Sequence, residues 1–265
     1  GDETEMTIKL EERHKPIEYT ISLTLDDGEF EEDTVVPDTY NIETETFILP
    51  NPEKTGYTFV GWKNGEADPV LNYEIAKGSM GNISLTAIWD ANEYTVRYNI
   101  NATTYITDDS EEPSTHTYDI SSALSENKFK RDYYTFEGWA TSSDGEKVYN
   151  DKAQVLNLTD VNDGEVILYA VWKPIEYTIT YENSANDAYP VIDGVEMRYT
   201  TIVNNNQTTY TVESRTINLT EVTCTGYTFT NWKYNGGTVV NNTISLPDNP
   251  LPETITITGE WQPTP

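Results

Sequence analysis

Pairs of neighbouring carboxylates are the residues of this chain whose types could do chemistry. Glycosidases hold two carboxylates at a defined separation in a cleft, one of them as the acid. With 45 acidic residues among 265, adjacent pairs are expected here without any catalytic role. The pairs do not recur at matching places along the chain, so we predict no catalytic residues and no enzyme activity. They include Asp26/Asp27, Glu31/Glu32, Asp108/Asp109 and Glu111/Glu112.

An oxygen-rich loop and a single cysteine are the other chemical candidates. Residues 160–165 (DVNDGE) offer oxygen ligands and a glycine, but the alternating ligand spacing of an EF-hand calcium loop is missing. A glycine turn before a strand at Val166 is the favoured interpretation. Cys224 has no second cysteine to pair with, and nothing in the pattern brings His14 or His116 to it. We expect a buried thiol, no metal site and no cofactor.

The elements that would position any site are organised around one seven-residue motif. The motif reads GYTFVGW at residues 56–62, YYTFEGW at 133–139 and GYTFTNW at 226–232. A phrase that returns three times in order is the signature of a tandem array. We therefore predict three repeats, and residues at matching places in them should have matching structural roles.

Each repeat opens and closes with a recognisable strand. Alternating strands start at Tyr19, Tyr94 and Tyr177, and closing strands end at three tryptophans, Trp89, Trp172 and Trp261. Four residues join a closing tryptophan to the next opening tyrosine at both joints. The predicted organisation has four parts: a tail of a preceding repeat or a leader strand (1–16), then modules at 17–91, 92–174 and 175–265.

The third module carries a longer insert, roughly residues 183–215, with alternation at Val195, Met197 and Tyr199. That alternation predicts an added hairpin or a long loop. Residues 121–127 (SSALSEN) are the best helix candidate, because Ser122 could cap the first turn and Glu126 would lie within it.

The motif itself predicts a β-bulge. Phe59 and Trp62 are three residues apart, so strict alternation would place them on opposite faces of a strand. An extra residue between them would bring both rings to one face. The residue before the motif tryptophan is Gly61, Gly138 or Asn231, and these types best tolerate the positive φ that a glycine-type bulge needs.

All six tryptophans fall at two repeat positions, which favours a core role over a sugar-stacking platform. The better ligand-binding candidates are tyrosines in the variable segments, which we expect to be exposed: Tyr105, Tyr189 and Tyr210. The predicted structural repeat positions are Tyr57, Phe59, Gly61, Trp62, Trp89, Tyr134, Phe136, Gly138, Trp139, Trp172, Tyr227, Phe229, Asn231, Trp232 and Trp261.

The net charge of the chain disfavours some classes of binding partner. The formal net charge is −29, which repels nucleic-acid phosphates and anionic membrane surfaces. No apolar run is long enough to cross a bilayer, so direct membrane insertion is not expected. The opening residues lack a signal-peptide pattern, and we expect them to continue from a longer protein.

The pattern of opening strand, GYTFxGW motif and Leu-x-Ala-x-Trp closing strand resembles the Listeria–Bacteroides repeat, the B-repeat of internalins. The resemblance runs from Tyr19 to Trp261. It implies a mainly β (α+β) fold: a tandem array of three small β-grasp-like modules, each a bent sheet packed on a short helix. It also implies secreted or wall-anchored bacterial proteins, in which such repeats serve as spacers or adhesive modules without catalytic residues. Asn231, Glu260 and the insert make the third copy divergent.

These observations predict a non-catalytic repeat region of a bacterial cell-surface or secreted protein. It would act as a spacer or stalk in the form of a monomeric rod, or also as an adhesin with weak multivalent contacts to a host or bacterial surface protein or glycan. The expected location is extracellular, at the cell surface or cell wall. The alternative is a carbohydrate-binding module array accessory to a secreted enzyme.

Overall fold

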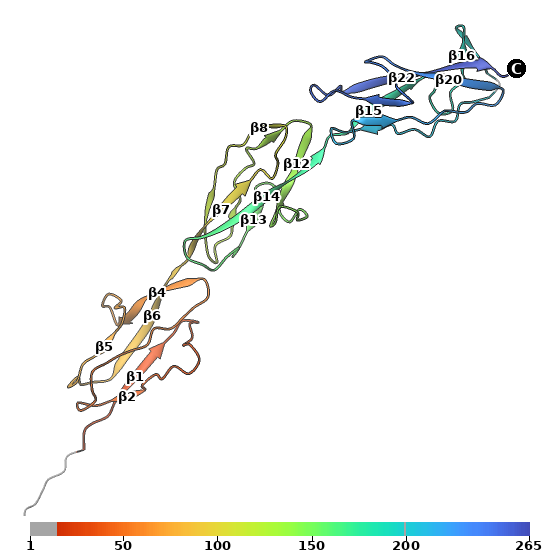
Figure 1. Cartoon of the computed structure of the whole chain (residues 1–265). Helices are drawn as coiled ribbons and strands as arrows, with labels where there is room; N and C mark the ends of the chain where they lie inside the picture. The colour runs from red at the N-terminus through yellow and green to blue at the C-terminus, as the bar shows by residue number, and fades with distance from the viewer. Residues whose placement is uncertain (1–14, 199) are drawn as a thin grey trace, which may run out of the picture. The chain divides into compact units, whose positions relative to one another are not determined.

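The computed structural model describes residues 15–198 and 200–265, and every regular element in them is a β-strand (Figure 1). Residues 1–14 of the expected repeat tail or leader strand, which include His14, and Tyr199 lie outside the described residues. The chain divides into two compact units. One comprises the chain up to Tyr98 with Glu112–Glu126 and Lys152–Leu168, and the other comprises Asn99–Glu111, Asn127–Asp151 and Tyr169–Pro265. The middle repeat therefore contributes to both units.

The first repeat is built on a four-stranded sheet of order β2-β1-β6-β4. The central pair, β1 and β6, is parallel, while β2 and β4 are antiparallel to their neighbours. A separate two-stranded ladder joins β3 and β5. The strands are β1 (Tyr19–Thr24), β2 (Thr39–Tyr40), β3 (Phe47–Ile48), β4 (Tyr57–Asn64), β5 (Glu74–Ile75) and β6 (Ile83–Ala91).

The middle repeat has the corresponding sheet, of order β12-β14-β7-β9, and small ladders β10–β13 and β11–β8. Its strands are β7 (Glu93–Asn99), β8 (Ile106–Asp108), β9 (Ser114–Thr117), β10 (Ser122–Ala123), β11 (Lys130–Arg131), β12 (Tyr134–Ala140), β13 (Gln154–Val155) and β14 (Gly164–Pro174).

The third repeat has the order β18-β15-β22-β20, again with a parallel central pair, β15 and β22. Within the insert, β16 and β17 form an antiparallel hairpin, which confirms the predicted hairpin. The strands are β15 (Tyr177–Glu182), β16 (Val191–Ile192), β17 (Val195–Glu196), β18 (Thr209–Tyr210), β19 (Thr216–Asn218), β20 (Tyr227–Tyr234), β21 (Thr243–Ser245) and β22 (Thr254–Pro263).

The predicted helix at 121–127 is wrong, and no helix occurs among the described residues. Ser122 and Ala123 form β10, which pairs with β13, and the Leu124 amide donates to the Ala153 carbonyl at 2.9 Å. Seven residues are too few for a helix that is stable by itself, and this ladder buries the Leu124 side chain. The α part of the predicted α+β class is therefore corrected. The β-grasp description of the modules stays a prediction.

The predicted bulge is present in all three motifs. The register of the motif strand against the closing strand shifts between Phe59 and Gly61, and at the two matching places. Gly61 and Gly138 have φ of 152° and 148°. Asn231 is not among the residues with positive φ, so the φ expectation fails there while the bulge itself holds. As predicted, the extra residue brings the motif phenylalanine to its tryptophan, with ring centroids 5.5 Å apart for Phe59 and Trp62.

Candidate functional site

The carboxylate pairs lie on exposed loops or turns, except that Asp108 is the half-buried last residue of β8. Asp26 and Asp27 both have positive φ in a turn after β1. Asp108 accepts hydrogen bonds from the Ser110 hydroxyl and amide, which lower the pKa of its carboxyl. Within the described ranges, no group of three or more potential metal ligands comes together. The 160–165 loop is the expected turn, in which the Gly164 amide donates to the Val161 carbonyl before β14.

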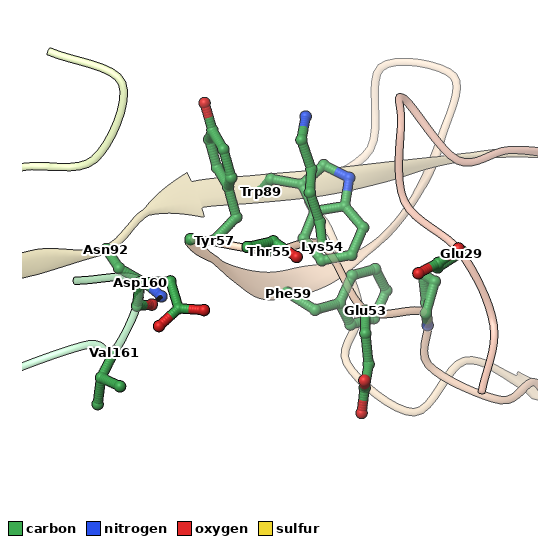
Figure 2. A pocket seen from close by; sticks show the side chains of 12 residues that line it. Glu29, Glu53, Lys54, Thr55, Tyr57, Phe59, Trp89, Asn92, Asp160 and Val161 are labelled. Carbon is green, nitrogen blue, oxygen red and sulfur yellow. Dashed lines mark hydrogen bonds between the residues drawn. The ribbon is translucent and has the colours of Figure 1, made fainter. Parts of the chain in front are cut away.

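An open groove of about 530 Å³ lies beside the motif strand of the first repeat (Figure 2). Phe59 and Trp89 contribute its aromatic rings, whose centroids are 5.2 Å apart. Two reciprocal backbone hydrogen bonds, of 2.8 and 2.7 Å, join Glu29 to Glu53 at one side. At the other side, the Asn92 side-chain amide donates to the Asp160 carbonyl at 2.6 Å.

The lining of the groove is mainly acidic. Glu29, Glu53 and Asp160 line it, with Lys54 as the one cation in the lining. The Lys54 ammonium donates to the Asp26 carbonyl at 2.9 Å and lies 4.4 Å from the centre of the Tyr57 ring. Neither a histidine nor a cysteine lines this groove, so its chemistry is that of a polar, negatively charged surface depression.

A groove at the matching place of the third repeat has different side chains. It has a volume of about 580 Å³ and also lies beside the motif strand. The backbone bridge of Glu29 with Glu53 is matched by a bridge of Val203 with Thr223. Thus valine and threonine stand where the first groove has two carboxylates, and Cys224 stands where it has Lys54. The groove follows from the strand arrangement; its motif tyrosine and phenylalanine are kept, while the charged residues of its lining change between the two repeats.

The tryptophans hold the core. The side chains of the three motif tryptophans, Trp62, Trp139 and Trp232, are at most 2% exposed. Each closing tryptophan instead donates its indole N–H to a backbone carbonyl near the end of the opening strand. The acceptors are Leu25 for Trp89 (3.0 Å), Ile100 for Trp172 (2.7 Å) and Asn183 for Trp261 (2.7 Å). Rings held in this way do not form exposed platforms for sugar stacking.

Comparison with known families accounts for this threefold pattern. The family description "Listeria-Bacteroides repeat domain" matches residues 19–88 and 94–171, more than half of the chain. The chain belongs to the Listeria-Bacteroides repeat family. A related description, "Divergent InlB B-repeat domain", matches residues 199–264. The divergence expected for the third copy is thus reflected in the separate family description that matches it.

Two relatives of the repeats come from Evansella cellulosilytica. One, provisionally named a Gly-rich membrane protein, is 27% identical over 143 residues, which cover 54% of this chain and 15% of that protein. The other, provisionally named a membrane protein, is 31% identical over 159 residues, 58% of this chain and 22% of that protein. The chain thus matches less than a quarter of either relative. In the part of the chain that the structure describes, no helix is long and apolar enough to span a membrane.

The three candidate tyrosines of the Listeria-Bacteroides repeats are not brought together at one surface site. Tyr210 was expected to be exposed, which is wrong: it is 1% exposed in the third-repeat core, and its hydroxyl donates to the Pro252 carbonyl. Tyr105 is half-buried and packs edge-on against Tyr133 at 5.2 Å. Tyr189 is 37% exposed and remains a surface candidate.

An alignment of the three repeats with one another would have predicted that Tyr210 lies in the core. Tyr40, His116 and Tyr210 face the opening tyrosines Tyr19, Tyr94 and Tyr177 at the same register. The dipeptides Thr39-Tyr40 and Thr209-Tyr210 are identical, and Thr115-His116 is their counterpart. Residues at this position therefore close the core of each repeat.

Two further groups that could react are buried. Burial raises the pKa of the Cys224 thiol, which disfavours the reactive thiolate. Burial lowers the pKa of His116, whose ring stacks on Tyr94 and makes hydrogen bonds with the hydroxyls of Ser114 and Ser122 at 2.7 and 2.6 Å. Both groups are structural parts of their repeats.

Proposed function

We propose that this chain is a non-catalytic spacer region of a bacterial surface protein, with any binding limited to weak contacts that add up over the repeats. The observation that supports this best is the use of the recurring residues. The motif tryptophans recur in every copy and lie in the core of each repeat. The closing tryptophans also recur in every copy and donate hydrogen bonds within their own repeats. By contrast, two exposed carboxylates of the first groove, Glu29 and Glu53, are not kept in the third copy.

The grooves support the same proposal. A dedicated array of ligand sites would keep its lining residues from repeat to repeat. Here Glu29 and Glu53 of the first groove are replaced by Val203 and Thr223 in the third repeat, whose lining has a carboxylate at another place, Glu221. The shared shape with changed chemistry fits repeats selected for folding rather than for one common ligand.

Location at the bacterial cell surface is part of the proposal. The membership in the Listeria-Bacteroides repeat family and the membrane-protein names of the relatives are in line with it. The net charge of −29 would keep a surface-exposed stalk soluble and would keep neighbouring stalks apart. The alternative, a carbohydrate-binding array, is disfavoured because exposed tryptophan platforms would have been its main feature.

A binding screen tests the proposal. The purified chain is presented at up to about 100 μM to arrays of glycans, mucins and host matrix proteins, since weak single sites have dissociation constants near the millimolar range. The spacer proposal predicts no saturable binding to any of them. A saturable glycan signal that Tyr189→Ala abolishes would contradict it and would establish a specific sugar site.

A further inference from the structure

The motif tyrosine of one repeat reaches a carboxylate of the next at both joints. The Tyr57 hydroxyl of the first repeat donates to the Asp119 carboxylate at 2.9 Å, and both residues belong to one compact unit. The Tyr134 hydroxyl of the middle repeat donates to the Glu213 carboxylate at 2.9 Å, and both belong to the other unit. Tyr57 and Tyr134 occupy the same position of the motif.

The two carboxylates also occupy one structural position. Each is the third residue of a four-residue turn that directly follows the core residue facing the opening tyrosine. In each turn the amide of the fourth residue donates to the carbonyl of the first: Thr44 to Asn41, Ile120 to Thr117, and Ser214 to Thr211. We call residues 41–44, 117–120 and 211–214 the acidic turns, with Glu43, Asp119 and Glu213 as their carboxylates.

Further contacts surround the first of these bonds. The rings of Tyr57 and Tyr118 meet edge to face at 5.8 Å, and the Thr58 hydroxyl donates to the Asn92 side chain at 2.7 Å. The Asn157 side chain also donates to Asp119, at 2.7 Å. A side chain at Gly56 would overlap the Tyr118 ring, so glycine is needed for the close approach there.

At the second joint, a tyrosine takes the place of that glycine. Tyr133 has a φ of 68°, in the left-handed region that Gly56 and Gly226 adopt at the matching positions. A tyrosine in this conformation is strained, and such strain is retained where other contacts compensate for it. Its hydroxyl donates to the Asn249 side chain at 2.6 Å and accepts from the Leu251 amide at 3.3 Å. Both partners belong to the third repeat.

The motif tyrosine of the third repeat and the acidic turn of the first repeat have no neighbouring repeat in this chain to contact, and they can be compared with the two joints. Among the described residues, the Tyr227 hydroxyl of the third repeat has no hydrogen-bond partner, and neither has the Glu43 carboxylate of the first. Ile42 is 47% exposed, whereas its counterpart Val212 is 3% exposed. The other counterpart, Tyr118, is half-buried and its ring contacts the Tyr57 ring edge to face. The turn surface is apolar and acidic where no motif tyrosine covers it.

We propose that the motif tyrosine and the acidic turn are the two halves of an interaction surface through which each repeat binds its neighbour and stabilises it. The partner of this surface is another repeat of the same family, recognised by a phenol donor for the carboxylate and an aromatic ring for the residue before it. This inference goes beyond the spacer proposal and holds equally if the chain proves to bind a ligand.

Removal of single hydroxyl groups in the full chain tests the proposal. Tyr57→Phe and Tyr134→Phe keep the ring and delete only the donor, and Tyr227→Phe is the matched control with no partner to lose. Hydrogen–deuterium exchange is read at the amides of Ile120, Ser214 and Thr44. We expect exchange about three- to tenfold faster at Ile120 in Tyr57→Phe and at Ser214 in Tyr134→Phe. Thr44 should be unchanged in every variant.

Two outcomes would overturn the proposal. Unchanged exchange at both Ile120 and Ser214 would mean that the bonds do not couple the repeats. Faster exchange of the same size in Tyr227→Phe would mean that the hydroxyl acts within its own repeat. The double variant Tyr134→Phe/Glu213→Gln tests whether the two side chains act through their shared hydrogen bond. If they do, amide exchange at Ser214 is no faster in the double variant than in either single variant. Additive increases in the exchange rate would count against the proposal.

Discussion

At the scale of single residues, the two tryptophans of each repeat have different roles. Trp62 is fully buried, and its indole N–H has no hydrogen-bond partner within the described residues. The side chain of Trp62 therefore contributes to stability through packing alone. Trp89 is half-buried and fixes the end of β1 through its bond to the Leu25 carbonyl. The packing role of Trp62 depends on the volume of its ring, and the role of Trp89 depends on its indole N–H donor.

Replacement of each tryptophan should separate these roles. Trp62→Ala leaves a large cavity in the first-repeat core and should lower the free energy of unfolding of that repeat by about 3–5 kcal/mol. Trp89→Phe loses one hydrogen bond and should cost about 1 kcal/mol. Urea unfolding, followed by amide exchange in first-repeat peptides, measures both. Equal losses for the two variants would contradict this division.

His116 predicts a pH dependence for the middle repeat. Burial holds the pKa of this imidazole below its ordinary value of about 6.5, so the folded repeat binds the proton less well than the unfolded chain. Stability from the neutral ring is present above pH about 6.5 and is lost as pH falls through the folded pKa. The first and third repeats have Tyr40 and Tyr210 at this position and lack the effect.

An NMR titration of the two histidine rings measures this directly. The His116 resonances should titrate below pH about 6.5. In His116→Tyr, which takes the residue of the other two repeats, the extra acid sensitivity of the middle repeat should disappear. A pKa of His116 at or above its ordinary value would show that folding does not disfavour the charged ring, which contradicts the prediction.

At the scale of elements, the bulge in the motif strand is the feature that glycine makes possible. A side chain at Gly61 would come within 2.6 Å of the Val70 backbone, and one at Gly138 would overlap the Tyr149 carbonyl. In both repeats the passing segment is bonded to the motif tryptophan, as in the 3.0 Å bond from the Trp62 amide to the Val70 carbonyl. The third repeat has no matching bridge among its described residues, and Asn231 is exposed there.

Substitutions at the bulge should therefore differ between repeats. Gly61→Ala and Gly138→Ala should each destabilise their own repeat by about 1–3 kcal/mol, because they combine a strained φ with a close backbone contact. Asn231→Gly should change stability by no more than about 0.5 kcal/mol. Thermal unfolding with amide exchange resolves the three repeats. A large loss in Asn231→Gly, or none in the glycine variants, would contradict the account.

The motif allowed much of the repeat to be predicted from the sequence. The bulge followed from the three-residue spacing of Phe59 and Trp62, and the buried tryptophans followed from their recurrence. The helix at 121–127 was wrongly predicted, because a local capping pattern does not show the β13 strand that pairs with the segment from about 30 residues away. The joint residues were missed because Asp119 and Glu213 lie in variable segments and look like ordinary surface charges.

At the scale of the whole molecule, the repeats and the compact units divide the chain differently. The sheets recur three times, once for each copy of the motif. The two compact units both include part of the middle repeat. The sheets predict three units that unfold separately, because each repeat holds its motif and closing strands together by its own ladder, whereas the compact units predict two.

Single-molecule pulling of the full chain is the measurement that tests this most directly. Three self-contained repeats predict three unfolding events, each releasing about 25–30 nm of chain for a repeat of roughly 70–85 residues. Trp62→Ala should weaken the unfolding event of the first repeat most. Two larger steps that match the compact units, or a single step for the whole chain, would contradict the description of this protein as an array of three repeats.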